Sequence, residues 1–314
     1  MSGPWCTFTP VDRTPLVRFQ EKDMTLADAS VRPAPSGSRT ASPFNVLTPE
    51  QLTFYREHGW LRLPGVFTLE ETRELQDELT WLIDDWAMKD AGWTGPWRKQ
   101  YMDVETEKKS KLIALHDLQY YSAPWARAVT KPWLCGAMAD LLGDGQSPSD
   151  VVEFHHSTLH VKPPETGHPF PMHQDWAFYK HADGRYVDVL VHLDDTRHEN
   201  GEIRFTDGSH KQGPLDHIVK DEEGKGCTPH LPFADYRLED TVAVPAKAGD
   251  VVLFNIFTIH GSYVNTTDRM RRLIRVGYKH PDNAQLEGQS KNRAGWTVWG
   301  RRQRREGAVQ FPTQ

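Results

Sequence analysis

Apolar residues in the first half of the chain recur at spacings of three and four, which is the pattern of helices with one buried face. A capping box that starts at Thr48 opens the first such helix. A second box at Thr68 opens a longer helix that runs to about Trp86, and a third helix covers about residues 132–142. The N-terminal half is therefore predicted to be mainly helical, with residues 90–110 left unassigned.

From residue 151 onward the pattern changes to short runs of β type. Residues 186–193 alternate, with valines on one face and Asp188, Leu190 and His192 on the other. Further strands are predicted at residues 151–161, 202–205, 241–245, 251–254 and 273–278. Turn dipeptides such as Asn-Gly and Asp-Gly separate these runs, which favours a sandwich or a small barrel.

The domain organisation follows from the distribution of proline and polar residues. Residues 1–45 contain six prolines and a polar run, which predict a flexible or draped N-terminal arm. No linker interrupts residues 46–314, so we expect them to form a single domain.

The composition argues against several classes of protein. Mean hydropathy is −0.64 and no apolar run is long enough for a membrane-spanning helix. A net charge of −6 gives no sign of a nucleic-acid partner. Cys6, Cys135 and Cys227 are too few and too far apart for a disulfide framework, and they predict a reducing, cytoplasmic location. The 15 histidines are more informative, because imidazole is the commonest metal ligand in proteins.

The sequence His173-Gln-Asp175 is the first candidate for chemistry. In an extended segment, residues two apart project to the same face. One imidazole and one carboxylate make up two thirds of the 2-His-1-carboxylate triad that binds Fe(II). With 15 histidines and 43 acidic residues in 314 positions, this spacing is expected about twice by chance, so the pair needs support from elsewhere in the chain.

That support comes from the predicted buried strand at residues 251–254. It is followed by His260, a candidate third ligand from a neighbouring strand. Arg271 comes eleven residues later, with Arg272 and Arg275 in the same run. A guanidinium matches a carboxylate with two parallel donors, which suits the distal end of a dicarboxylic acid, and Ser262 could donate to the same group. Taken alone, the arginines would indicate a salt-bridged strand edge.

Together these features resemble the phytanoyl-CoA dioxygenase family of Fe(II)/2-oxoglutarate oxygenases, over about residues 47–280. The resemblance lies in the Leu-Thr-Pro-Glu-Gln opening, Arg-Glu-His-Gly-Trp-Leu, His173-Gln-Asp175, Asn-Gly-Glu-Ile, Asp-Gly-Ser-His, Ala-Gly-Asp-Val-Val-Leu-Phe, and His260-Gly-Ser262 with Arg271. It implies a mainly β fold with flanking helices, in which a double-stranded β-helix (a jelly-roll, cupin-like barrel) carries the N-terminal helices on its outside.

The resemblance also implies cofactors and residue roles. Fe(II) would be held by His173, Asp175 and His260, with 2-oxoglutarate as cosubstrate and O2 as oxidant. Arg271 would bind the distal carboxylate of 2-oxoglutarate, with Ser262 beside it.

A further cosubstrate contact is implied on the strand that precedes the ligand pair. The corresponding element reads Thr158-Leu-His160-Val-Lys162-Pro163, which makes Thr158 and His160 candidates for cosubstrate binding. His160 stands where the family more usually has an amide side chain.

The carboxylate at Asp175 bears on the reaction, because halogenases of this class have a small residue at that position. The resemblance therefore implies hydroxylation of an unactivated C–H bond of a small molecule, with release of succinate and CO2. Desaturation or ring formation by the same oxidising chemistry remains an alternative. So do a non-catalytic metal-binding barrel of the same fold and a zinc or manganese hydrolase or isomerase, neither of which needs a dicarboxylate clamp.

Aromatic residues directly after the ligand pair are candidates for the wall of the substrate site. They are Trp176, Phe178 and Tyr179, with His155 from the first strand run as a further candidate. Core packing is an equal alternative for the aromatic residues, since they favour both environments. The polar segment 211–226 is either a lid or a solvated insertion.

Overall fold

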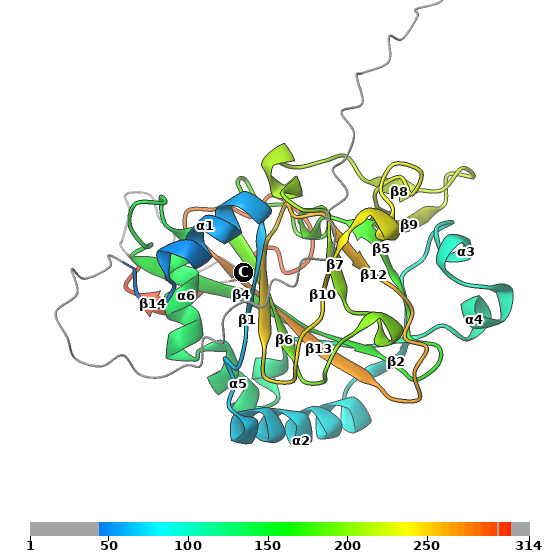
Figure 1. Ribbon diagram of the computed structural model, residues 1–314, viewed down its shortest axis with the longest axis horizontal. Coiled ribbons are helices and arrows are strands. Elements are labelled where there is room, and N and C mark those ends of the chain that lie inside the picture. Colours follow the sequence, from blue (N-terminus) through cyan, green and yellow to red (C-terminus); the bar gives the residue numbers. More distant parts are fainter. Residues whose placement is uncertain (1–43, 294, 303–314) are drawn as a thin grey trace, which may run out of the picture. The chain divides into compact units, whose positions relative to one another are not determined.

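The computed structural model describes residues 44–293 and 295–302. Its helices and strands are shown in Figure 1. The helices are α1 (Pro49–His58), α2 (Leu69–Asp85), α3 (Arg98–Tyr101), α4 (Val104–Lys109), α5 (Ala123–Val129) and α6 (Pro132–Leu142). The strands are β1 (Trp60–Leu63), β2 (Met88–Ala91), β3 (Leu112–His116), β4 (Val151–Lys162), β5 (Phe170–His173), β6 (Tyr186–His192), β7 (Ile203–Phe205), β8 (Ile218–Lys220), β9 (Gly226–His230), β10 (Val242–Val244), β11 (Val251–Asn255), β12 (His260–Ser262), β13 (Arg271–Lys279) and β14 (Trp296–Gly300).

Two antiparallel sheets form the framework. The larger has eight strands in the order β1-β11-β6-β13-β4-β3-β2, with β14 paired to β4, and the smaller has the order β10-β7-β12-β5. Strands β8 and β9 form a separate hairpin. The predicted mainly β, jelly-roll fold with helices outside is confirmed. The expected closed barrel is not: within the described residues the terminal strands of each sheet pair on one side only, so hydrogen bonds do not join the sheets into a ring.

Both predicted capping boxes form and set the starts of α1 and α2. The Thr48 hydroxyl accepts from the backbone of Gln51, and the Thr68 hydroxyl accepts from the backbone of Glu71. Gly59 ends α1 with φ 81°, a left-handed conformation that glycine adopts without a steric penalty. The short polar signals in the sequence therefore fix where these helices begin and end.

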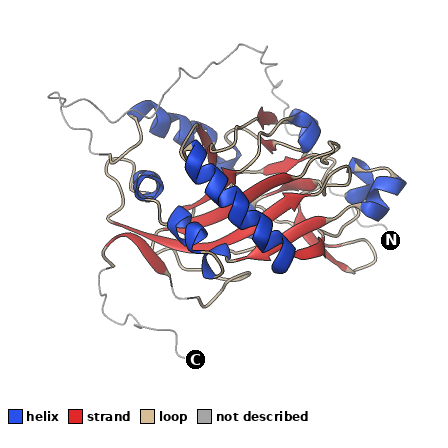
Figure 2. Cartoon of the chain, turned by 90° about the horizontal axis from the view of Figure 1, so that it is seen from below, coloured by secondary structure: helices blue, strands red, loops and turns tan. Residues whose placement is uncertain are grey.

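Helices α2 and α6 cover one face of the larger sheet. Figure 2 shows the long helix α2 lying across the strands. Leu79 and Leu82 of α2 and Leu134 of α6 are buried in one cluster with Val189 and Val191 of β6. The alternation predicted for residues 186–193 is thus confirmed, since the valines face the helices. Both faces of β6 are buried, because its other face turns towards the smaller sheet.

A cavity that contains the candidate site residues lies between the two sheets. Along β13, Ile274 faces the helix-side core, whereas Arg271, Leu273 and Arg275 project between the sheets and line one cavity. Leu273 and Phe205 belong to a second apolar cluster that contains residues of both sheets. The polar groups between the sheets are therefore flanked by apolar packing that keeps them out of bulk water.

The N-terminal half is less helical than the sequence predicts. Strand β1 pairs with β11, and β3 pairs with β4 and β2, so three early strands belong to the larger sheet. These strands have four or five residues, which is too short for a period to stand out from the flanking helices. The unassigned segment 90–110 contains the end of β2 and the short helices α3 and α4.

Most of the predicted arm over residues 1–45 lies outside the described residues. Phe44 packs against the core, and Asn45 donates to Asp140 of α6 from both its backbone (2.8 Å) and its side chain (2.9 Å). A single domain over residues 46–314 stays a prediction. Across the described residues, no helix combines the length and the apolar character that crossing a membrane requires.

Candidate metal centre

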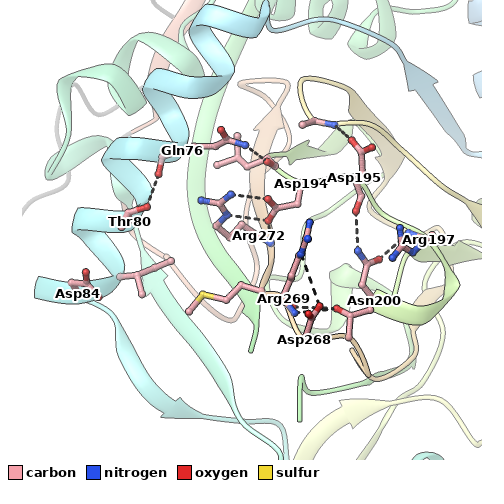
Figure 3. A pocket seen from close by; sticks show the side chains of 15 residues that line it. Gln76, Thr80, Asp84, Asp194, Asp195, Arg197, Asn200, Asp268, Arg269 and Arg272 are labelled. Atoms are coloured by element: carbon pink, nitrogen blue, oxygen red, sulfur yellow. Dashed lines mark hydrogen bonds and ion pairs between the residues drawn. The ribbon is translucent and has the colours of Figure 1, made fainter. Parts of the chain in front are cut away.

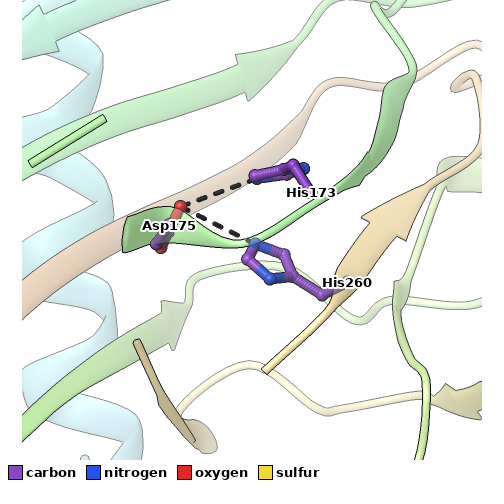
Figure 4. A group of neighbouring side chains, drawn as sticks. All are labelled: His173, Asp175 and His260. Carbon is purple, nitrogen blue, oxygen red and sulfur yellow. Dashed lines mark ion pairs between the residues drawn. The ribbon is translucent and has the colours of Figure 1, made fainter. Parts of the chain in front are cut away.

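Three predicted ligands converge between the sheets. His173 ends β5, Asp175 begins a short 3-10 helix (Asp175–Ala177), and His260 begins β12, directly opposite His173 in the β5–β12 pairing. One ligand atom from each lies within 4.8 Å of the others, and all three side chains are buried. Figure 4 shows both imidazoles directed at the Asp175 carboxylate. Within the described residues this is the one such group of three His, Cys, Asp or Glu side chains.

Backbone carbonyls fix the tautomers of both histidines. Nδ1 of His173 lies 2.7 Å from the Pro171 carbonyl, and Nδ1 of His260 lies 2.9 Å from the Thr258 carbonyl. A carbonyl only accepts, so each Nδ1 carries the proton and each Nε2 keeps its lone pair. These Nε2 atoms lie 3.5 and 3.8 Å from Oδ1 of Asp175. Two imidazole nitrogens and one carboxylate oxygen are the donor set of a non-haem Fe(II) centre, so the residues fit that metal.

The environment favours the protonation states that bind a metal. Burial and the neighbouring His173 ring lower the pKa of His260 to about 3, so its imidazole is neutral at physiological pH. Burial by itself raises the pKa of Asp175, but Arg275 and the two histidines outweigh it and hold that pKa well below its usual range. The site therefore holds a neutral imidazole beside an ionised carboxylate, as metal ligation requires.

The three arginines of β13 have different surroundings. Arg272 pairs with Asp194 through Nε (3.0 Å) and Nη2 (2.7 Å). Arg275 donates to Asp188 and to the Tyr179 hydroxyl. Arg271 is 3% exposed, and its side chain makes no hydrogen bond or ion pair with another described residue. Burial lowers its pKa only to about 10, so it stays charged at neutral pH. An unpaired buried guanidinium that lines the same cavity as the ligands is suited to a bound carboxylate.

Sequence comparison accounts for this combination. The family model "Phytanoyl-CoA dioxygenase (PhyH)" matches residues 55–273, a range that includes all three ligands and Arg271. The chain belongs to the phytanoyl-CoA dioxygenase family. It is accordingly an Fe(II)- and 2-oxoglutarate-dependent dioxygenase, as the sequence predicts.

Individual proteins are similar to this chain in sequence or in fold. L-proline trans-4-hydroxylase of Streptomyces griseoviridis is 27% identical over 248 residues, which cover 73% of this chain and 85% of the relative. The carbocyclase SnoK of nogalamycin biosynthesis has a similar fold, with a TM-score of 0.61 at 22% identity over 77% of this chain and 88% of SnoK. The iron-bound structure of EctD from S. alaskensis has a TM-score of 0.57 at 24% identity, over 84% of this chain and 86% of EctD.

The residues predicted to contact the cosubstrate of this dioxygenase are not all in one place. Ser262 and His160 line the cavity with Arg271. The Ser262 hydroxyl accepts a 2.8 Å hydrogen bond from Nζ of Lys162, a buried lysine that pairs with Arg271 in the sheet register. Thr158 contacts Arg275 (3.3 Å) and the ring of His116 (3.2 Å) and is absent from the cavity wall.

The residues predicted to contact the substrate also lie in different surroundings. The Phe178 ring lies 5.6 Å from the His173 ring. Trp176 instead packs on Phe257, and its indole donates to the His181 carbonyl. Tyr179 is fully buried and donates to Asp188. The buried His155 has Nδ1 2.8 Å from the Tyr186 hydroxyl, in a polar network behind the ligands.

Trp93 lies at the metal centre, although it is not predicted there from the sequence. The Trp93 ring lies 4.8 Å from His173, 4.6 Å from Phe170 and 4.9 Å from Phe178. Its segment is tied to β9 by two hydrogen bonds between Thr94 and Thr228. The Trp-Thr-Gly-Pro-Trp sequence around Trp93 was a usable signal, because paired tryptophans flanking a turn seldom lie in open solvent.

The metal centre lies in a small cavity, and a larger hollow lies elsewhere in the described residues. The cavity lined by the ligands and Arg271 has a volume of about 40 Å³. A groove of about 830 Å³ runs between α2 and the loops around residues 194–200 and 267–270. Figure 3 shows two ion pairs among its charged side chains, Arg272 with Asp194 and Arg269 with Asp268. Of these two hollows, the smaller is the one in which the candidate ligand atoms and the Arg271 guanidinium meet.

Proposed function

We propose that His173, Asp175 and His260 hold Fe(II), that Arg271 clamps the distal carboxylate of 2-oxoglutarate, and that the enzyme hydroxylates an unactivated C–H bond of a small molecule. The observation that carries this proposal is the meeting of three ligand atoms with one unpaired, buried guanidinium in a single cavity. Bound Fe(II), 2-oxoglutarate and O2 would supply the oxidant, with succinate and CO2 as co-products.

Two further side chains, Ser262 and His160, could donate hydrogen bonds to the cosubstrate. Because Lys162 donates to the Ser262 oxygen, the hydroxyl proton of Ser262 is free to donate to a carboxylate beside Arg271. His160 is neutral, since burial and Arg275 lower its pKa well below the usual value, and it retains one N–H donor like the amide it replaces. Thr158 would act only indirectly, through Arg275.

The aromatic side of the cavity would receive the substrate. Trp93 and Phe178 lie against each other and against the His173 ring, where they would exclude water from the reacting centre. Aromatic walls suit an apolar part of a small molecule. Trp176, Tyr179 and His155 would support this wall from behind rather than touch substrate.

Asp175 favours hydroxylation over halogenation, because with Fe(II) bound its carboxylate would take the coordination position that a halide would need. Burying Arg271 without a charged partner destabilises the folded state. A metal-binding barrel without activity, or a zinc or manganese hydrolase, would gain nothing in return. The unpaired thiols of Cys135 and Cys227 support the predicted cytoplasmic location.

The direct test is formation of succinate from 2-oxoglutarate with Fe(II) and ascorbate, in the parent enzyme and in Arg271→Ala. Loss of two charge-assisted hydrogen bonds should raise the half-saturating 2-oxoglutarate concentration by about 100-fold. Binding of Mn(II) should not change, since Arg271 is not a ligand.

Arg272→Ala is the matched control, because that side chain leaves the same strand on the opposite face and pairs with Asp194. It should keep the parent affinity for 2-oxoglutarate. Unchanged 2-oxoglutarate affinity in Arg271→Ala would contradict the assignment of the clamp.

A further inference from the structure

The two oxygens of the Asp175 carboxylate have different neighbours. Oδ1 lies 3.5 and 3.8 Å from the Nε2 atoms of His173 and His260. Oδ2 lies 3.8 Å from Nε of Arg275, and neither of these two buried atoms has a hydrogen-bond partner in the described residues. An N–H donor and a carboxylate oxygen that are buried, close together and without another hydrogen-bond partner need only a small shift to form a hydrogen bond.

The Arg275 guanidinium is fixed on its other side. Nη1 donates to Asp188 Oδ1 (2.9 Å) and to the Tyr179 hydroxyl (2.5 Å). Nη2 lies 2.8 Å from His156 Nε2 and 3.3 Å from Thr158 Oγ1. Because a guanidinium is planar, these contacts leave the Nε–H as the one donor that can turn to Asp175.

The contact between Arg275 and Oδ2 of Asp175 matters because Fe(II) has a limited number of coordination positions. A facial triad leaves three of six positions open only if its carboxylate binds through one oxygen. A chelating keto acid takes two of them, and the oxidant needs the third. A carboxylate that binds through both oxygens would remove that third position.

We propose that Arg275 is a positioning residue that holds Oδ2 of Asp175 and so makes this carboxylate a ligand through Oδ1 alone. The inference rests on the proposed metal site. It assigns Arg275 a function separate from that of Arg271, although both project from the same face of β13. Asp188, which is 0% exposed, anchors the guanidinium from behind.

The test counts exchangeable water molecules on the bound metal by water-proton relaxation of the Mn(II)-loaded enzyme, without cosubstrate. Removing Arg275 alone would leave Asp188 buried without its cationic partner, so the main variant is the double change Arg275→Met with Asp188→Asn. It should show one fewer exchangeable water than the parent. With Fe(II), succinate formation should fall by about 10-fold or more, the usual effect of losing an outer partner of a metal ligand.

A second variant, Arg275→Lys, keeps the charge but replaces the planar fork by a single point of donation. It should also lose one water, so either folded variant decides the question. Arg272→Met is the matched control, since it removes a paired guanidinium on the opposite face of β13, and it should keep the parent count of water molecules.

The outcomes separate this inference from the proposed function. An unchanged water count and succinate formation within about twofold of the parent in the Arg275 variants would overturn the role of Arg275 while leaving the metal site intact. Failure of the parent itself to bind Mn(II) would instead overturn the proposed site.

Discussion

Backbone carbonyls two residues upstream hold Nδ1 of several histidines in this protein, and not only at the metal centre. His181, His217 and His230 make the same contact, at 2.6, 2.9 and 2.9 Å. The contact therefore sets the tautomer but does not identify a ligand. His173 and His260 differ because their free Nε2 atoms meet at one carboxylate.

Substitution of Trp93 tests whether the aromatic side of the cavity excludes water from the metal centre. Its ring lies beside His173 and Phe178, so Trp93→Ala should admit water to the metal. We expect succinate formation without substrate to rise several-fold, with no change in affinity for Mn(II).

Trp86→Ala is a suitable control for Trp93→Ala. Trp86 is 53% exposed and packs on Tyr121. Its variant should match the parent in both measurements. If Trp93→Ala also matched the parent, the ring would serve packing and not the site.

At the scale of elements, the sequence predicts best where a local signal marks a boundary. The boxes at Thr48 and Thr68 predict the starts of α1 and α2, and the apolar run before His260 predicts β11. The strands that escape prediction are short or bear side chains with no period, such as β1 and β14. Their place is set by pairing with β11 and β4, which lie far away in sequence.

The same distinction applies to the site. His173, Asp175, His260 and Arg271 follow from motif spacing, and the structure brings all four to one cavity. The proposed role of Arg275 could not be predicted from spacing, because it depends on a contact with Asp188 of another strand. Tyr179 is expected from the sequence to contact the substrate. Its buried hydroxyl instead donates to Asp188, because a buried hydroxyl needs a hydrogen-bond partner.

For the molecule as a whole, buried histidines predict a loss of stability in mild acid. Burial lowers the pKa to about 3 or about 4 for the following residues: His155, His168, His181, His192, His217 and His260. In the unfolded chain they would titrate near pH 6.5. Below that pH the unfolded state binds more protons, so the stability present above it is lost as the pH falls.

We expect the free energy of unfolding of the metal-free protein, measured with urea, to fall steeply from about pH 7 to about pH 5. Each histidine contributes up to about 1.4 kcal/mol per pH unit. Asp188, whose pKa burial and Asp175 raise, acts in the opposite direction but is a single group. His192→Gln should make the slope shallower, and a flat profile in the parent would show that these histidines are not neutral in the fold.

Anaerobic titration of the metal-free protein with Fe(II), followed by calorimetry, measures directly whether His173, Asp175 and His260 hold the metal. We expect one tight Fe(II) site per chain in the parent. Replacing His173, Asp175 or His260 with alanine should weaken that site by about 10- to 100-fold or more, with the fold intact by circular dichroism. Parent-like Fe(II) affinity in any of these three folded variants would show that these side chains do not hold the metal.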